Sequence, residues 1–231
     1  MRLFGEINLN GNGICTSLQG MYMQTELLNN INENVIGFNK VGYQRKEAVI
    51  SSFAEIAGVH ALSKTTDKSV GRIRLTGNPL DLSIANEGYF QYLTPQGVKL
   101  TRDGRFKIDK DGHLLTQEGF RILSFGGKPM KFNKIPEDLD QVKFNKDGSV
   151  SMVDFKTKQT YEVGRLSVVS LDGNVAQDID IRQGYTEDSN VRLQTEFFRM
   201  VPVRRNFEAN RQLFITQNDE LSKTIQELGR S

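Results

Sequence analysis

The stretch "FFRMVPVRRNFEANRQLFITQNDELSKTI", residues 197–225, has the spacing of a long helix that packs along a single stripe. Alternating steps of three and four residues join one set of its side chains: Phe197, Met200, Arg204, Phe207, Arg211, Phe214, Asn218, Leu221 and Ile225. This heptad pattern is typical of helices that pair along a seam, although a two-stranded coil prefers apolar residues at all of these positions. The polar members therefore predict polar partners on whatever structure faces this helix.

The C-terminal helical region extends beyond this stretch, from about residue 188 to residue 229. Asp188 or Ser189 is the expected N-cap, and Gly229 is the expected stop. Pro202 lies inside the region, where a proline removes one backbone hydrogen bond. We therefore expect a short helix, a kink near residue 201, and a longer helix that follows it.

A second heptad stripe lies near the N-terminus, between residues 14 and 36. Its members follow one another in alternating steps of four and three: Ile14, Leu18, Met21, Thr25, Leu28, Asn32 and Val35. Gly37 supplies a stop, and residues 1–13, rich in Gly and Asn, are expected to fray. Because both stripes share one register, we expect the two chain ends to meet, in a parallel or an antiparallel pairing.

This pairing predicts which side chains meet, either within one chain or between neighbouring chains. The apolar members Phe207, Phe214, Leu221 and Ile225 are expected to meet Met21, Leu28 and Val35. The polar members Arg204, Arg211 and Asn218 are expected to fix the register against Thr25, Asn32 or acidic groups of adjacent chains.

The region between the two helices, residues 43–185, predicts short strands. Apolar and polar residues alternate in runs such as "LDLSI" (80–84) and "RFKID" (105–109), and Asp-Gly pairs separate several of these runs. Such pairs are a strong hairpin signal because both residues tolerate a positive φ. The expected fold class is mixed α and β, with N- and C-terminal amphipathic heptad helices flanking a central antiparallel all-β domain. The expected domains are residues 1–42, 43–185 and 186–231.

Composition limits the functional classes. The 231 residues carry 30 basic and 28 acidic side chains, so the net charge does not indicate a nucleic-acid partner. Apolar residues make up 37%, mean hydropathy is −0.45, and no apolar run is long enough to span a bilayer. The N-terminus lacks the apolar segment of a secretory signal peptide, and the single cysteine, Cys15, excludes an internal disulfide framework. We therefore expect a cytosolic protein or one exported without a cleaved signal.

No group of residues in the sequence predicts catalysis, a cofactor or a metal. The motif "DKDG", residues 109–112, begins like a calcium loop but lacks the acidic residues that complete one, so we interpret it as a hairpin turn. His60 and His113 have no partner at ligand or triad spacing, and no nearby histidine could activate Cys15. We expect neither an enzyme nor a small-molecule substrate.

Three segments carry motifs of a known family. In "QGYTEDSNVRLQTEFFRMVPVRRNFEANRQLF", residues 183–214, they are Gly184, Glu187, Ser189, Asn190, Val191, Arg205, Phe207, Glu208 and Asn210. In "LTRDGRF", residues 100–106, they are Thr101, Arg102, Asp103, Gly104 and Phe106. In "ENVIGFNKVGYQRK", residues 33–46, they are Asn34, Asn39, Gly42 and Tyr43. Through these segments, which occur in the family's order, the chain resembles the bacterial flagellar basal-body rod and hook proteins.

The sequence also departs from that family's pattern. Glutamine is usual at the position of Arg204, and a helix-compatible residue is usual at the position of Pro202. Glu33, Ile36, Gly37 and Lys40 break the N-terminal motif. Residues 53–76 lack the Gly- and Ser-rich insertion of distal rod proteins, and the chain is shorter than a hook protein. The resemblance therefore favours a rod subunit, distal or proximal, over a hook subunit.

The resemblance implies a structural function without catalysis. Proteins of this family leave the cell unfolded through the flagellar type III export apparatus and polymerise into a helical tube that transmits torque from motor to hook. The implied partners are copies of the chain itself and other rod or hook subunits, and the implied location is the flagellar basal body. Head-to-tail contacts that do not close give such open helical assemblies. Helices that cannot bury their stripe alone are expected to order as they assemble.

Two alternatives belong to other classes. A monomeric surface binding or adhesion module would use the β domain for recognition and the helices as a stalk. A wall-cutting hydrolase has no sequence support beyond the abundance of acidic residues.

Overall fold

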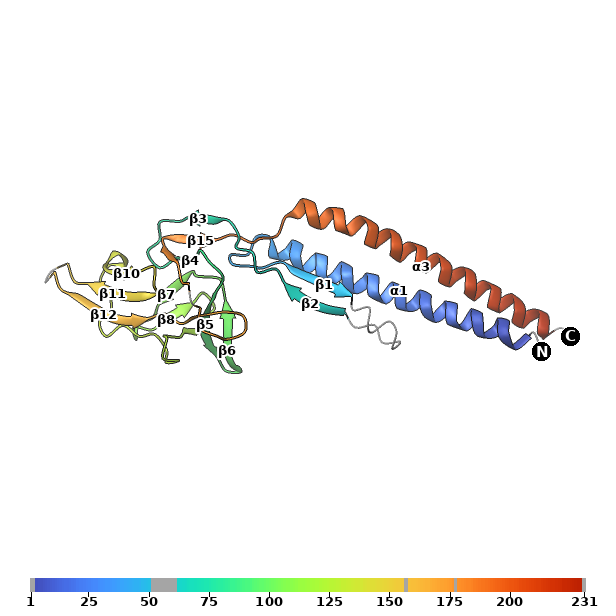
Figure 1. Ribbon diagram of the computed structural model, residues 1–231, viewed down its shortest axis with the longest axis horizontal. Helices are drawn as coiled ribbons and strands as arrows, with labels where there is room; N and C mark the ends of the chain where they lie inside the picture. Colours follow the sequence, from blue (N-terminus) through green and yellow to red (C-terminus); the bar gives the residue numbers. More distant parts are fainter. Residues whose placement is uncertain (1–2, 51–61, 156–157, 177, 230–231) are drawn as a thin grey trace. The chain divides into compact units, whose positions relative to one another are not determined.

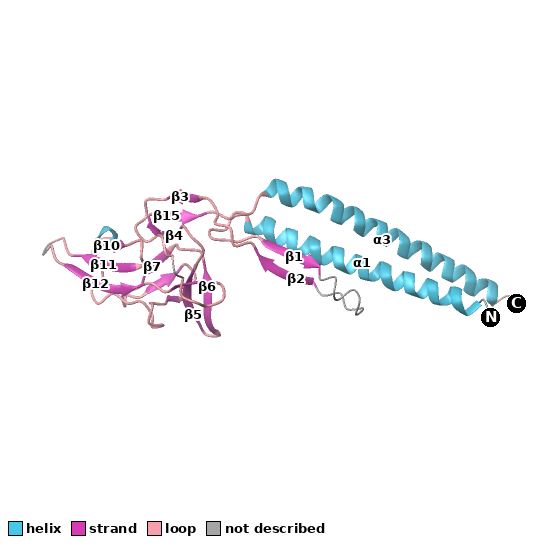
Figure 2. Ribbon diagram, in the orientation of Figure 1, coloured by secondary structure: helices cyan, strands magenta, loops and turns pink. Residues whose placement is uncertain are grey.

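The computed structural model describes residues 3–50, 62–155, 158–176 and 178–229. The chain divides into two compact units. Residues Met1–Ile36, Lys46–Asp67 and Arg192–Ser231 form the first, called here the helical unit; Gly37–Arg45 and Lys68–Val191 form the second, the β unit. Two long helices and a set of antiparallel strands confirm the expected fold class (Figure 2).

The helical unit contains α1 (Leu3–Gly37), α3 (Leu193–Leu228) and an antiparallel strand pair, β1 (Lys46–Ile50) and β2 (Leu62–Thr66). The two helices lie side by side and antiparallel (Figure 1). Within the described residues, no helix combines the length and the apolar character needed to cross a membrane.

Helix α1 begins at Leu3, so the Gly- and Asn-rich residues that follow are helical rather than frayed as expected. Pairing with α3 explains why Gly13 is helical, because Gly13 lies against the side chain of Gln217. A glycine is favourable where another element approaches closely, in spite of its low helix propensity. The helix ends at Gly37, as the sequence predicts.

Helix α3 begins at Leu193, and its N-cap is Arg192 rather than the expected Asp188 or Ser189. The preceding residues instead form strand β15 (Tyr185–Glu187) and an extended segment, and the N-cap residue Arg192 makes no side-chain cap bond. The helix ends at Leu228, with Gly229 as its C-cap.

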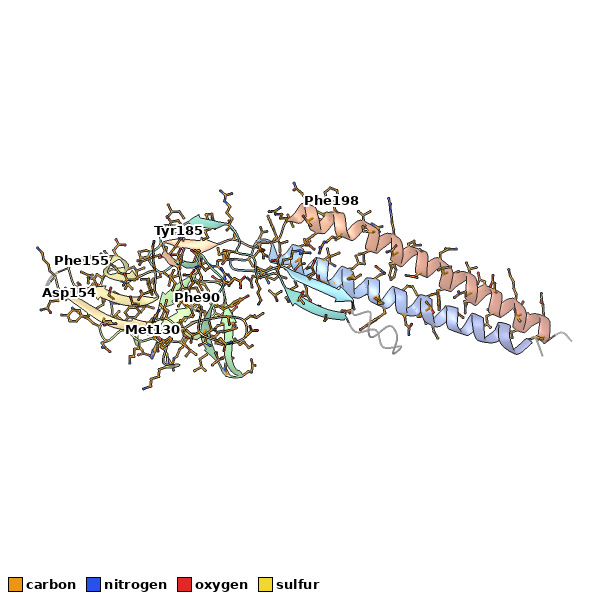
Figure 3. All side chains as sticks on the ribbon, in the orientation of Figure 1. Phe90, Met130, Asp154, Phe155, Tyr185 and Phe198 are labelled. Atoms are coloured by element: carbon orange, nitrogen blue, oxygen red, sulfur yellow. The ribbon has the colours of Figure 1, made fainter. Side chains whose placement is uncertain are left out.

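Pro202 lies inside α3, which continues through it as one element, so the expectation of two separate helices is wrong. The carbonyl that loses its partner belongs to Phe198, four residues earlier on the same face. Phe198 is 79% exposed and Pro202 is exposed, so this face lies toward solvent (Figure 3). Water can therefore satisfy the freed carbonyl.

The strands of the β unit form several small antiparallel sheets. The strands are β3 (Ile73–Leu75), β4 (Leu82–Ile84), β5 (Tyr89–Thr94), β6 (Gly97–Thr101), β7 (Phe106–Ile108), β8 (Leu114–Thr116), β9 (Arg121–Ile122), β10 (Val142–Phe144), β11 (Ser149–Val153), β12 (Thr160–Arg165), β13 (Val168–Val169), β14 (Ile181–Gln183) and β15. The largest sheet has the order β13-β5-β9-β8-β7, with β6 paired to β5. A second sheet has the order β10-β11-β12, and β14 pairs with β4 while β15 pairs with β3. Strands late in the sequence thus complete the sheets begun by early ones.

One apolar core joins the largest sheet, the β10-β11-β12 sheet and the β14–β4 pair. Its members are fully or almost fully buried and include Leu82, Ile84, Phe90, Phe106, Leu114, Ile122, Phe132, Val150, Leu166 and Ile181. The rings of Phe90 and Phe106 meet edge to face at 5.2 Å, a favourable geometry for an aromatic pair. The family-motif residue Phe106 is therefore a core residue.

The Asp-Gly pairs are not equivalent. Gly112, Gly148 and Gly173 have φ values of 83°, 87° and 80°, which fit the expected turns. Gly104 does not adopt a positive φ; instead, a β-carbon there would collide with the carbonyl oxygen of Leu82. Gly104 thus permits a close backbone approach rather than a hairpin.

The division of the chain differs from the expected bounds at residue 43. The strand pair β1–β2 belongs with the helices, whereas residues 37–45 belong with the β unit. Hydrogen bonds explain the grouping, because Lys46 in β1 exchanges two with the Asn34 side chain and Glu47 pairs with Arg199 of α3. Residues 51–61, which include His60 and part of the segment expected to be short, lie outside the described residues.

Candidate functional site

Two side-chain contacts define the alignment of α1 against α3. Asn34 Nδ2 donates to Glu196 Oε2 at 3.3 Å, and Ser17 Oγ donates to Gln217 Oε1 at 3.3 Å. Between them, a β-carbon built on Gly20 would lie 2.7 Å from the Asn210 side-chain nitrogen. The helices are therefore antiparallel and closely approached along their length.

The stripe that faces inward in this pair, called here the inner seam, is richer in polar and small residues than the expected one. Its residues on α1 are buried or half-buried: Ser17, Gly20, Gln24, Leu27, Ile31 and Asn34. Those on α3 are Glu196, Met200, Val203, Phe207, Asn210, Phe214, Gln217 and Leu221. Both sets keep the heptad spacing.

The expected stripe on α3 divides into two groups. Met200, Phe207, Phe214 and Leu221 are half-buried in the inner seam, whereas Phe197, Arg204, Arg211, Asn218 and Ile225 are exposed. The inner seam contains Glu196, Val203, Asn210 and Gln217 instead of Phe197, Arg204, Arg211 and Asn218, so each seam residue lies one position earlier in the sequence. Apolar periodicity favours the aromatic residues and does not reveal Glu196, Asn210 and Gln217 as seam residues, because polar residues are unusual in a seam. Arg211 pairs with Glu208 of its own helix at 2.9 Å.

The expected stripe on α1 is shifted in the same direction. Ile14, Met21, Leu28 and Val35 are half-buried, whereas Leu18, Thr25 and Asn32 are exposed. Each inner-seam residue of α1 lies one position before a residue of the expected stripe. Ser17 and Gly20, rather than larger apolar residues, therefore face α3. A signal for this shift exists in the sequence, since Gly13, Gly20 and Asn34 share one heptad position.

The residues displaced from the seam belong to a second, exposed heptad stripe on each helix, called here the outer stripes. On α1 they are Cys15, Leu18, Tyr22, Thr25, Asn29, Asn32 and Ile36. On α3 they are Phe197, Val201, Arg204, Glu208, Arg211, Ile215, Asn218, Ser222 and Ile225. Several large apolar side chains are widely open to solvent, including Tyr22 (65%), Ile36 (67%) and Ile225 (61%).

The buried pair Asn34 and Glu196 joins three elements of the helical unit. Asn34 Nδ2 also donates to the carbonyl of Lys46, and its Oδ1 accepts from the Lys46 amide at 2.9 Å. Next to it, Glu33 accepts from the ammonium groups of Lys46 and Lys64. The hydrogen bond from Lys46 and then that from Lys64 lower the pKa of the Glu33 carboxyl below its usual value. This corner therefore ties α1 to α3 and to both strands of the hairpin.

In the β unit, Arg102 of the central motif is almost fully buried against Glu187 of the C-terminal motif. Arg102 Nε lies 2.6 Å from Glu187 Oε2, with side chains 1% and 2% exposed. The remaining guanidinium donors bond to backbone carbonyls of Ile84, Asn86 and Gly88. The guanidinium also lies 5.8 Å from the ring centre of Tyr89, and burial raises the pKa of that phenol despite the nearby positive charge.

The N-terminal motif reaches the same place. The Gly42 amide donates to the Glu187 carbonyl at 2.7 Å, and the Asn190 amide donates to the Tyr43 carbonyl at 3.3 Å. Gly42 has a φ of 67°, and a β-carbon there would collide with the backbone of Arg102. Residues from all three family-like segments therefore meet in one cluster.

The other motif residues have varied environments. Thr101 Oγ1 accepts from the Asp103 amide, Gly184 donates its amide to Asp81, and Ser189 Oγ accepts from the Val191 amide. Val191 is buried, whereas Asn39, Arg205 and Glu208 are exposed.

The turn at residues 109–113 brings together two carboxylates and an imidazole. Ligand atoms of Asp109, Asp111 and His113 lie within 4.8 Å of one another. Asp109 Oδ1 already accepts the backbone amides of Asp111 and His113, which lowers the pKa of the Asp109 carboxyl. This geometry is that of an Asx-type turn, in agreement with the interpretation of "DKDG" as a hairpin turn.

Two family models match the chain. The one described as "Flagellar hook protein FlgE/F/G D1 domain" matches residues 83–152, in the β unit. The one described as "Flagellar basal body rod FlgEFG protein C-terminal" matches residues 182–228, which span β15 and α3.

Individual relatives agree with these matches. The flagellar basal-body rod protein FlgG of Bacillus subtilis (strain 168) is 29% identical, over 87% of this chain and 91% of the relative. The rod protein FlgF of Mesorhizobium japonicum is 28% identical, over 84% of this chain and 87% of the relative. The rod protein FlgF of Caulobacter vibrioides is 30% identical, over 69% of this chain and 70% of the relative.

Proposed function

Since the chain belongs to the flagellar basal-body rod protein family, we propose that it is a structural subunit of the rod in a bacterial flagellar basal body. Its partners are further copies of itself and other axial subunits, and it reaches them through the flagellar type III export apparatus. The function requires no catalysis, cofactor, nucleic acid or small-molecule substrate.

The observation that carries this proposal is the pair of outer stripes. Large apolar side chains recur along the solvent side of both helices, with Tyr22 and Ile36 on α1 and Phe197 and Ile225 on α3 about half exposed or more. Exposed apolar side chains that recur at one helical spacing, separated here by polar residues, form a surface suited to contact with a neighbouring subunit. Its heptad spacing suits another helix rather than a small ligand.

The inner seam supports the same conclusion. Gly20 and polar residues occupy half of its positions, and among its apolar residues Ile31 alone is fully buried whereas the others are half-buried. Each fully buried large apolar side chain contributes about 1.5–3 kcal/mol, so neighbouring subunits that cover the outer stripes would supply a substantial part of the stability. Repeated contacts between different surfaces of identical subunits then build an open helical tube, through which torque passes from motor to hook.

The proposal is tested by comparing assembly of the full chain with that of a chain ending at Val191. The shortened chain keeps the whole β unit and its motif cluster but lacks α3. We expect the full chain to form rod-like polymers in sedimentation and electron microscopy. We expect the shortened chain to stay monomeric while its aromatic circular dichroism shows a folded β unit. Polymers formed equally well without α3 would contradict the mechanism.

A further inference from the structure

The chain passes between its two units through three short segments of the β unit, residues 37–45, 68–72 and 187–191. Hydrogen bonds join all three of these crossing segments to one another, chiefly through residues 187–190. We propose that Arg102, Glu187 and Asn190 form a clasp that fastens the crossing segments together, so that they leave the β unit as a single fixed bundle.

The first crossing segment is fastened by both main chain and side chain. Its Gly42 amide donates to the Glu187 carbonyl, and its Tyr43 carbonyl accepts from the Asn190 amide. The Arg45 amide donates to Asn190 Oδ1 at 2.6 Å. Neither residues 37–45 nor residues 188–191 form a regular strand, so these bonds replace the ladder that a sheet would provide.

The second crossing segment is fastened to the same stretch from its other side. The Asp188 amide donates to the Arg72 carbonyl at 2.9 Å. Asn190 Nδ2 donates to the Ser69 carbonyl, also at 2.9 Å. The amide group of Asn190 therefore bridges two crossing segments, accepting from one and donating to the other.

Arg102 anchors this arrangement in the β unit. One Glu187 carboxylate oxygen receives the Arg102 guanidinium, and the other receives the Gly71 amide at 2.9 Å. A buried charge that loses its partner is strongly unfavourable. Removal of the guanidinium therefore drives the Glu187 carboxylate toward water, away from Gly71. The backbone carbonyl of the same residue, Glu187, accepts from Gly42 of the first crossing segment. Movement of Glu187 therefore weakens the attachment of both the first and the second crossing segment.

Steric contact adds to the polar contacts. Gly42 passes directly over the backbone of Arg102 and Asp103, where no β-carbon fits, so the first crossing segment and the central motif are in direct contact. The clasp is a property of the single chain, and it does not depend on assembly.

Amide hydrogen exchange of the full-length monomer tests the clasp. We expect Arg102→Met to cause loss of protection at the amides of Gly42, Asp188 and Asn190. Amides that bond within the core, such as those of Phe106 and Leu123, should keep theirs. Arg102→Lys keeps the charge but cannot reproduce the planar fork, so we expect an intermediate loss.

Two further variants make the test decisive. Arg105→Met removes an arginine that pairs with Asp103 at the surface, and it should leave the crossing segments protected. Asn190→Ala removes the side-chain bridge between the first and second crossing segments without leaving a buried charge. It therefore tests the clasp even if Arg102→Met does not fold. Unchanged protection of Gly42 and Asp188 in Asn190→Ala would overturn the clasp. So would an Arg102→Met protein in which core and crossing segments lose protection to the same extent.

Discussion

Asn34 of α1 donates a hydrogen bond to Glu196 of α3, and both side chains are buried in the helical unit. A polar pair at this depth contributes little net stability but fixes which residues of the two helices lie opposite each other. We therefore interpret it as the residue pair that sets the register of the inner seam.

The first prediction follows from that pair. Glu196→Ala leaves the buried Asn34 without one of its partners, and we expect a loss of about 1–3 kcal/mol in the free energy of unfolding. Glu196→Gln can still accept the hydrogen bond and should lose less. Urea unfolding followed by helical circular dichroism measures both variants. Equal stability of Glu196→Ala and the parent chain would contradict the role assigned to the pair.

A second prediction concerns the close approach at Gly20. Gly20→Leu places a large side chain where Asn210 now lies, so we expect the helices to separate and the melting temperature of the helical unit to fall. Asn29→Leu adds a leucine to the exposed side of the same helix and serves as the matched control. The interpretation fails if both variants melt alike.

A third prediction separates assembly from folding. Tyr22→Glu changes an outer-stripe residue that is 65% exposed, so the monomer should change in stability by no more than about 0.5 kcal/mol. The same change places a charge in the surface proposed to meet a neighbour, and polymer formation should stop. Sedimentation at matched concentrations measures the second effect. Normal polymers from Tyr22→Glu would exclude this part of α1 from the interface.

A fourth prediction uses the exposed arginines of α3. We expect the double change of Arg204→Leu and Arg211→Leu to leave the isolated helix equally or more stable, because leucine is a good helix former. The polar groups that we propose to set register between neighbouring subunits are then absent, so aggregates should replace ordered rods in electron micrographs. Ordered rods from this double variant would show that the arginines do not specify the contact.

The fifth prediction concerns pH. Glu33 has its pKa lowered in the folded chain by hydrogen bonds from Lys46 and Lys64. Its contribution to stability is therefore complete above the unfolded-state pKa of about 4.3, and it is lost as the pH falls through the lower folded-state value. The protection of the β1 and β2 amides, measured relative to their intrinsic exchange rate at each pH, should fall over that acidic range. In Glu33→Gln, the protection of these amides should depend less on pH over the same range. An unchanged pH dependence would mean that other groups cause it.

The sequence predicts the elements of this fold better than their contacts. Heptad spacing locates both helices, and Asp111-Gly112 and Asp147-Gly148 locate turns correctly, because these signals are local. The start of α3 is less predictable: residues 188–191 stay extended because the amides of Asp188 and Asn190 bond to the carbonyls of Arg72 and Tyr43, which lie more than a hundred residues away.

The candidate site illustrates the same limit. Apolar periodicity selects Phe207 and Phe214 correctly for the inner seam but selects Leu18 over Ser17 and Gly20, which are the residues that face α3. Hydrophobicity cannot reveal a seam that depends on close approach and polar pairing. The contact between Arg102 and Glu187 joins residues distant in sequence, so only the folded chain shows it.

Electron tomography of basal bodies in cells of the source organism tests the central claim most directly. Cells that lack this chain should retain the motor but have an incomplete rod, with neither hook nor filament, and restoring the chain should restore all three. Complete flagella in cells without it, in the absence of a second gene for the same subunit, would contradict the assignment as a rod subunit.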